Sequence, residues 1–228
     1  MPGQEPTMTR RLDAAYEREL LAIRTHVAKM AALAEEMVQD AVRVLIDRDP
    51  DLARKVRDAD ANLDRIELEC DQLCATILAR RSPVAGDLRM VTGTLKLVTD
   101  LERIGDLAVN ICKRSLQIGP GASSVPKEVA ELAECVTAEL ALALEALVRQ
   151  DSTLARRLRA EDRSTDERNR TAFERLLGLS NERPDSFEDL LALTNVCRNL
   201  ERIGDHAVNI SERVVYMVDG TVVRHSPE

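Results

Sequence analysis

The sequence predicts an all-α protein built from two tandem, pseudo-symmetric three-helix bundles, with six long antiparallel helices in total. Only 2% of its 228 residues are aromatic while 44% are hydrophobic, a composition typical of helices packed through aliphatic side chains. Apolar residues recur at helical spacing within long segments bounded by helix breakers. In addition, the segment LERIGDLAVNI at 101–111 returns as LERIGDHAVNI at 200–210, with Leu107 replaced by His206.

Three helices are predicted in the first half of the chain. The first, 12–47, ends at RDPD, because Pro50 disfavours the helical conformation at the residue before it. The second, 51–80, ends at RRSPVAGD, and the third spans 85–117. The connecting loops are short, so consecutive helices are expected to pack as antiparallel neighbours.

The second half is predicted to begin after a strong break in helical pattern. The segment IGPGASSVP contains two glycines and two prolines and is predicted to separate the halves. Beyond it, helices are predicted at 127–149, 152–179 and 186–218, with SNERPD between the last two. The expected organisation is a disordered N-terminus (1–11), a first three-helix repeat (12–118), a linker (119–126), a second three-helix repeat (127–219) and a C-terminal tail (220–228).

The similarity between the halves extends beyond the LERIGD segments. DPDLARKVRDADANLD at 49–64 aligns with DSTLARRLRAEDRSTD at 151–166, at an offset of 102 residues. The offset falls to 99 for Glu102 and Glu201, so the loop between the second and third helices of the later half is three residues shorter. Each repeat is therefore expected to contain the same three-helix unit.

Composition limits the classes of partner. The formal net charge is −8 and the pI is near 5.1, so the protein should repel the phosphate backbone of nucleic acids. No apolar run approaches the roughly 20 residues that span a bilayer, and the N-terminus has no signal-peptide hydrophobic stretch. We therefore expect a cytoplasmic protein with no nucleic-acid partner and no direct membrane insertion. The five cysteines are interpreted as small buried side chains.

Acidic residues four positions apart are the main candidates for chemistry. Spacing of four places two carboxylates on one helix face, with Cβ atoms roughly 5 to 6 Å apart. Such pairs occur on the second and third helices of each half, so four acids converge if those helices are neighbours. Like charges in a groove favour a compensating cation or bound protons. The candidate metal ligands are Asp60, Asp64, Glu102, Asp106, Asp162, Asp166, Glu201 and Asp205.

The residue types near these acids indicate which cation would suit them and whether arginine could replace it. Clustered carboxylates with little His or Cys suit cations such as Mg, Mn, Ca or Fe better than a structural zinc site. Arg103 and Arg202 could instead neutralise the acids, although adjacent helical residues point about 100° apart. Gly105 and Gly204 indicate a close approach of another helix or a ligand. His206 is interpreted as a rim or hydrogen-bonding residue.

The paired LERIGD-AVNI helices, each preceded by a helix with acidic residues four apart, resemble the PhoU family of phosphate-uptake regulators. SPVAGDLR resembles the family's link into its third helix, and VVYMVDGTVVRH resembles its C-terminal end, so the resemblance covers nearly the whole chain. It implies two pseudo-symmetric three-helix bundles and multinuclear metal clusters held by (E/D)xxxD motifs, which fall on the eight carboxylates given above. Divalent or trivalent ions, namely Fe, Mn, Zn or Mg, are the expected cofactors.

The resemblance also implies a role. Proteins of this family restrain high-affinity phosphate import and keep the phosphate-starvation response off when phosphate is plentiful. They are expected to act between the ATP-binding subunit of the phosphate ABC transporter and a membrane sensor histidine kinase. Exposed aliphatic helix faces make a homodimer the expected assembly. The pattern departs from the family in two respects, since Asp100 is matched by Asn199 and the second helix of the later half lacks the longer acidic stripe.

Two other classes of function compete with this one. A carboxylate-bridged enzyme of the di-iron type would need Glu-x-x-His pairs, but His26, His206 and His225 do not follow a Glu by three positions. No nucleophile motif or glycine-rich phosphate loop is recognisable either, so no catalysis is predicted. The remaining alternative is a metal-free helical scaffold whose acids form a solvated face. Glu67 and Asp71 extend the first acidic stripe, but the second half does not repeat them.

Overall fold

The computed structural model describes residues 8–119, 124–161, 163–182 and 186–222. Nearly all of this described part is α-helical and none of it forms a strand, which confirms the predicted all-α class. No helix within it combines the length and the apolar character needed to cross a membrane.

The first half contains the three predicted helices. They are α1 (Met8–Asp47), α2 (Pro50–Arg81) and α3 (Ala85–Ser115). Helix α1 begins earlier than expected, so 8–11 is helical and the prediction of disorder there is wrong, because that stretch continues α1 without a Gly or Pro to stop it. Residues 1–7 lie outside the described residues.

The second half contains four helices among its described residues. They are α4 (Lys127–Arg149), α5 (Ser152–Glu161), α6 (Arg163–Glu182) and α7 (Phe187–Asp219). The helix predicted at 152–179 corresponds to α5 and α6, and residue 162 between them lies outside the described residues.

Equivalent capping residues start the second helix of each half. The carboxylate of Asp49 accepts hydrogen bonds from the backbone N–H groups of Asp51 and Leu52, at 2.8 and 3.2 Å. Asp151, its equivalent at the offset of 102, accepts from two N–H groups at the start of α5, both at 3.0 Å. Such caps satisfy amides that have no partner within the helix. The repeat is therefore present in the local structure as well as in the sequence.

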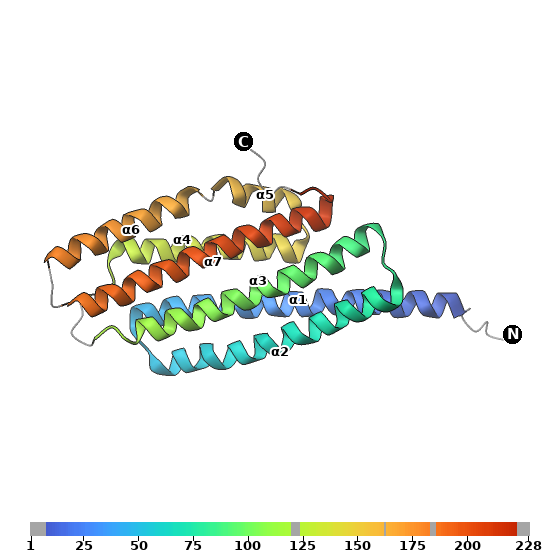
Figure 1. The fold of residues 1–228 in the computed structure, drawn as a ribbon, viewed down its shortest axis with the longest axis horizontal. Helices are drawn as coiled ribbons and strands as arrows, with labels where there is room; N and C mark the ends of the chain where they lie inside the picture. Colours follow the sequence, from blue (N-terminus) through green and yellow to red (C-terminus); the bar gives the residue numbers. More distant parts are fainter. Residues whose placement is uncertain (1–7, 120–123, 162, 183–185, 223–228) are drawn as a thin grey trace.

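The two halves lie side by side along their length (Figure 1). Helices α3 and α7 run next to each other in the middle, with α2 at one edge and α5 and α6 at the other. Helix α1 also contacts α4, and the buried apolar side chains of both halves form one continuous core. The outer groove between α2 and α3, which carries the acids of the first half, lies away from this joint.

A buried ionic contact joins the halves. Asp100 on α3 is only 5% exposed; its Oδ1 lies 3.0 Å from Nδ1 of His206, and Arg213 donates from Nε to its Oδ2 at 2.5 Å. Burial favours the neutral carboxyl group, but the bonds from His206 and Arg213 outweigh burial and lower the pKa of Asp100. The change from Leu107 to His206 between the repeats is thereby explained, because His206 faces a carboxylate on the other half.

Candidate metal site in the groove between α2 and α3

Four of the predicted ligands lie along the line where α2 and α3 pack together, here called the groove of the first half. Asp60 and Asp64 lie on α2, and Glu102 and Asp106 lie on α3. Asp64 is exposed and the other three are half-buried. The negative charges of Asp64 and Asp106 both act on Asp60 and on Glu102. The four carboxylates are thus close enough to influence one another's ionisation, and their role as metal ligands stays a prediction.

The groove makes these carboxylates harder to ionise. Burial raises the pKa of Asp60 from 3.8 to about 6, with further contributions from Asp64 and Asp106 that outweigh the opposing effect of Lys113. Burial also raises the pKa of Glu102, and the negative charge of Asp106 raises it further. Because negative charge is disfavoured here, the folded groove favours a bound cation over the free carboxylates.

Two further acids of α2 belong to the same groove. Burial raises the pKa of Glu67, and the charges of Asp71 and Asp64 add to that effect. Burial also raises the pKa of Asp71, whose Oδ1 is buried and accepts no hydrogen bond. Buried carboxylate oxygens normally have a partner, so this oxygen is an available donor atom for a cation. The groove thus contains six carboxylates, two more than the repeated pattern predicted.

Arg103 remains beside the acids of its own helix. Its Nε lies 3.3 Å from Oε2 of Glu102, and its Nη1 lies 3.1 Å from Oδ2 of Asp106. Arg103 thus pairs with the acids although adjacent helical residues point in different directions, because its long side chain turns back over the next turn. About half of this side chain is exposed, and ion pairs of that kind contribute little stability. One arginine also offsets only one charge of the six.

Gly105 allows α2 and α3 to approach closely at the groove. A Cβ atom at this position would lie 2.5 Å from Cδ2 of Leu63 and 3.1 Å from Oδ1 of Asp60. A Cβ at this distance would force Leu63 to shift, so glycine allows the two helices to pack this closely without such a shift. The predicted close approach is confirmed, and it brings the carboxylate of Asp60 against the backbone of α3.

The residue types in the groove fit a hard or borderline cation, although the side chains are not arranged around one. Within the described residues, no group of three or more His, Cys, Asp or Glu side chains is close enough together to hold a metal ion. Binding would therefore require the carboxylates to turn inward. Oxygen donors, raised carboxyl pKa values and the unpartnered Asp71 oxygen all fit such an ion.

The predicted ligands of the second half are less well defined. Asp162 lies outside the described residues, Asp166 and Asp205 are exposed, and Glu201 is half-buried. Gly204, the equivalent of Gly105, has its nearest non-local neighbours at an ordinary contact distance of 3.5 Å. The second carboxylate set therefore stays a prediction from the repeat.

A buried polar pair replaces apolar residues in the second half. Next to Gly204, the hydroxyl of Thr165 donates a hydrogen bond to the carboxylate of Glu139, and both side chains are buried. At the offset of 102, the first half has Leu63 and Met37 at these positions. The sequence reasoning missed this pair, although the alignment of the halves would have placed a carboxylate at a core position.

We expect Asp60→Asn to stabilise the metal-free protein by about 1 kcal/mol at neutral pH, after discounting for partial exposure. The raised pKa means that the folded state holds this proton more tightly than the unfolded state does, so ionised Asp60 costs stability. That cost develops as the pH rises from 3.8 to about 6, so the gain should vanish at lower pH. Urea unfolding across this range measures it.

Asp58→Asn is the matched control for this prediction, because Asp58 lies on the same helix and is exposed. It should change the free energy of unfolding little at any pH. Equal effects of the two variants would contradict the assigned environment of Asp60.

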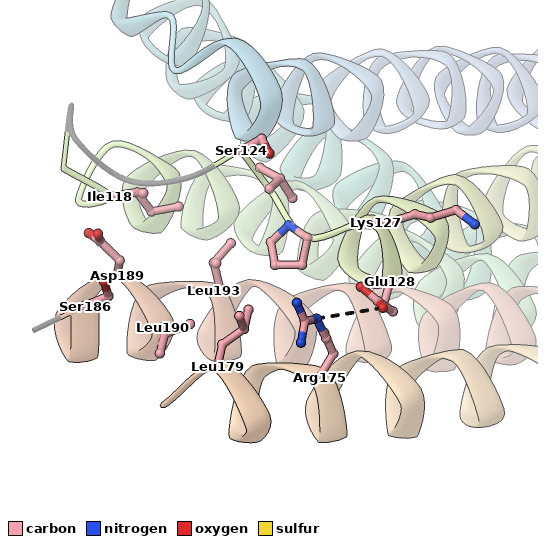
Figure 2. Close-up of a pocket in the computed structure, with 12 residues that line it drawn as sticks. Ile118, Ser124, Lys127, Glu128, Arg175, Leu179, Ser186, Asp189, Leu190 and Leu193 are labelled. Atoms are coloured by element: carbon pink, nitrogen blue, oxygen red, sulfur yellow. Dashed lines mark ion pairs between the residues drawn. The ribbon is translucent and has the colours of Figure 1, made fainter. Parts of the chain in front are cut away.

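A pocket of about 430 Å³ opens at the end of the second half, between the linker, α6 and α7 (Figure 2). Leu179, Leu190 and Leu193 form an apolar floor, and the loosely paired charges of Arg175 and Glu128, 4.0 Å apart, lie at its rim. In the first half, the early turns of α1 lie over the equivalent place. Helix α4 begins at the equivalent of residue 25 and has no such turns.

The early turns of α1 are held in the first half by two polar contacts. Glu19 accepts two hydrogen bonds from Arg81 at the end of α2, and the hydroxyl of Tyr16 donates to Asp87 at the start of α3. Within the described ranges, the second half has no equivalent of these turns beside its pocket.

The fold and the groove together define a duplicated helical-bundle protein with a carboxylate site on the first bundle. The PhoU domain family matches residues 27–115 and 129–214, which is one match in each half. The chain belongs to the PhoU family, as the resemblance of its repeated motifs indicated.

Relatives support this assignment over nearly the whole chain. The chain is 40% identical over 222 residues to the phosphate-specific transport system accessory protein PhoU homolog of Pseudomonas putida, covering 96% of this chain and 86% of that protein. It is 39% identical to the homolog of Pseudomonas aeruginosa, covering 96% and 91%. The crystal structure of PhoU from Pseudomonas aeruginosa superimposes with a TM-score of 0.85 at 39% identity, covering 90% of this chain and all of that chain (100%).

The relatives also bear on catalysis. They are named as accessory proteins, and the family is one of regulatory accessory proteins. The prediction that the chain is not an enzyme is therefore confirmed by family membership, which also argues against the di-iron alternative.

Proposed function

We propose that this protein is an accessory protein of phosphate transport that restrains high-affinity uptake and keeps the phosphate-starvation response off in rich phosphate. The observation that carries the proposal is 40% identity across 96% of the chain to a named accessory protein of phosphate-specific transport. The proposed partners are the ATP-binding subunit of the phosphate ABC transporter and a membrane sensor histidine kinase. The protein would act in the cytoplasm, as a homodimer.

Exposed apolar side chains of the second half support an adaptor role. Phe173 and Leu177 on α6, and Phe187 and Leu191 on α7, are each more than half exposed. The members of each pair are four positions apart and so share a helix face, and exposed apolar surface on a folded protein marks contact sites for other proteins. The pocket between the same two helices adds a place for a partner's side chains. We therefore propose that partners contact the second half through α6 and α7.

The proposed metal would be held chiefly in the first half. Asp60, Asp64, Glu102 and Asp106 would bind it, and a bound cation would supply positive charge that links α2 to α3. Fe, Mn, Zn and Mg are the candidate ions, since carboxylates can bind all of them. A second site is proposed by the repeat at Asp162, Asp166, Glu201 and Asp205.

A bacterial deletion strain tests the regulatory role. Loss of the gene should switch on a phosphate-starvation reporter in rich phosphate, and the intact gene on a plasmid should silence it again. A deletion strain that still represses the reporter would overturn the regulatory assignment. Pull-downs with the transporter ATPase and the sensor kinase, with and without metal, then test each proposed partner.

Metal analysis tests the metal-binding part. Chelator-stripped protein is expected to take up Mn, Fe or Zn, and replacement of Glu102, Asp106, Glu201 and Asp205 by Ala should abolish the uptake. Glu134→Ala with Glu145→Ala removes two exposed carboxylates of α4 and is the control. Equal metal content in wild type and the four-site variant would favour the metal-free scaffold, and the reporter assay would then show whether regulation survives.

A further inference from the structure

A cavity lies where α1, α3, α4 and α7 meet, at the joint between the two halves. It consists of two adjoining spaces of about 250 and 330 Å³ that share the lining residues Arg24, Met90, Leu147, Gln150 and Met217. Their sum falls within the range of about 300 to 1,000 Å³ that is usual for small-molecule sites. The cavity is separate from the acidic groove, because α2 contributes nothing to its lining.

Arg89 brings an unsatisfied positive charge to this cavity. Its side chain is half-buried, and its Nε is fully buried and donates to no acceptor. Its guanidinium lies against Gly220, where an added Cβ would be 3.4 Å from Nε. In the described structure no carboxylate lies within ion-pair distance of it. A half-buried guanidinium without partners is costly, so an anion at this place would relieve that cost.

Arg24 adds a second positive charge at the exposed side of the cavity. It too forms no ion pair within the described part of the chain. The one carboxylate of the lining, Asp87, already accepts a hydrogen bond from the hydroxyl of Tyr16 at 3.0 Å. Two cationic side chains and one anionic side chain therefore line the larger space, of about 330 Å³. The protein as a whole has a net charge of −8. This local excess of positive charge selects for anions.

The smaller space, of about 250 Å³, contains an unsatisfied polar atom beside apolar side chains, and the exposed Arg24, Arg149 and Gln150 also line it. Thr94 is 1% exposed, and its hydroxyl oxygen has no hydrogen-bond partner. Met90, Leu147 and Met217 surround it as apolar lining. Buried hydroxyl groups normally find a partner, so a polar atom of a bound molecule would complete the bonding of Thr94.

We propose that this cavity binds a small oxyanion ligand, with a phosphate-type group held by Arg24 and Arg89. Guanidinium groups match the oxygens of phosphate with paired, charge-assisted hydrogen bonds, and two of them suit a dianion. Any organic body attached to the group extends over the apolar wall toward Thr94. The binding site does not depend on the regulatory function proposed above, because its test measures binding alone.

Methyl NMR of the full-length protein tests this site, with inorganic phosphate and phenyl phosphate as probes. Met90 and Met217 line both spaces, so their methyl signals are expected to shift with each probe in a saturable way. Similar affinity for the two probes identifies a site for the free ion. Tighter binding of phenyl phosphate identifies a site for an organic phosphate that uses the apolar wall. Absence of saturable shifts with both probes overturns the proposal.

Charge variants test which residues hold the anion. Arg24→Gln should weaken binding about tenfold, the value of one charge-assisted hydrogen bond, and Arg24 is exposed, so the fold should tolerate the change. Arg89→Gln should weaken it at least as much. Asp87→Asn should strengthen binding, because it removes the only negative charge of the lining.

Arg198→Gln removes an exposed charge of α7 outside the cavity and is the matched control. It should leave the affinity unchanged. Equal weakening by Arg198→Gln and Arg24→Gln would show an unspecific charge effect and overturn the site. Weaker binding in Asp87→Asn would also overturn it.

Discussion

Asp100→Ala is expected to lower the free energy of unfolding by about 3 to 5 kcal/mol, the usual cost of removing one partner from a buried ion pair. Asp100 is 5% exposed and accepts bonds from His206 and Arg213, whose side chains are 18% and 15% exposed. Alanine would leave the guanidinium of Arg213 buried without a counter-charge. Because Asp100 lies on α3 and its partners lie on α7, the loss should also weaken the contact between the halves.

Urea unfolding of the metal-free protein measures this effect. Asn199→Ala is the matched control, because Asn199 is the repeat equivalent of Asp100 and its loss should cost much less. Asp100→Leu combined with Arg213→Met should recover most of the stability, since a well-packed apolar pair can replace a buried ion pair. The assignment fails if Asp100→Ala unfolds at the same urea concentration as Asn199→Ala.

Gly105→Ala and Gly204→Ala are expected to change stability in opposite directions, although the two glycines are repeat equivalents. At Gly105 a Cβ would lie 2.5 Å from Leu63, which is fully buried. Overpacking of this kind lowers the free energy of unfolding by about 1 to 3 kcal/mol, and the better helix propensity of alanine raises it by about 1 kcal/mol. At Gly204 the nearest atoms are 3.5 Å away, so only the gain of up to about 1 kcal/mol remains.

Thermal unfolding of the two single variants tests this difference. Gly105→Ala should melt below wild type and Gly204→Ala above it. Since Oδ1 of Asp60 lies 3.1 Å from the same added Cβ, Gly105→Ala should also reduce metal uptake, whereas Gly204→Ala should not reduce uptake in the first half. Two stabilised variants would mean that Leu63 yields easily, and that the tight approach of α2 to α3 is not required.

Helix positions were predictable because their signals are local. Proline and glycine ended the predicted helices within a few residues of the observed ends, and Asp49 and Asp151 capped equivalent helices. The early start of α1 was missed because its first turn lacks an apolar stripe to signal it.

The candidate site was predictable only in part. Spacing of four placed Asp60 and Asp64 on one helix face and Glu102 and Asp106 on another, and the short loop made those helices neighbours. The spacing did not reveal that Arg103 turns back to pair with Glu102 and Asp106. A long side chain can reach atoms that lie away from the direction in which its Cα–Cβ bond points.

The sequence alone determined the two repeats, their helices and the eight acids, since periodicity, capping and helix breaking act within a few residues along the chain. The tertiary structure decided which side chains meet and which are buried. Asp100 meets His206 and Arg213 across 106 and 113 residues of sequence, and burial between helices raises the pKa of Asp60. The contacts of Asp100 and the burial of Asp60 both depend on how whole helices pack against each other, and a local sequence pattern does not determine that packing.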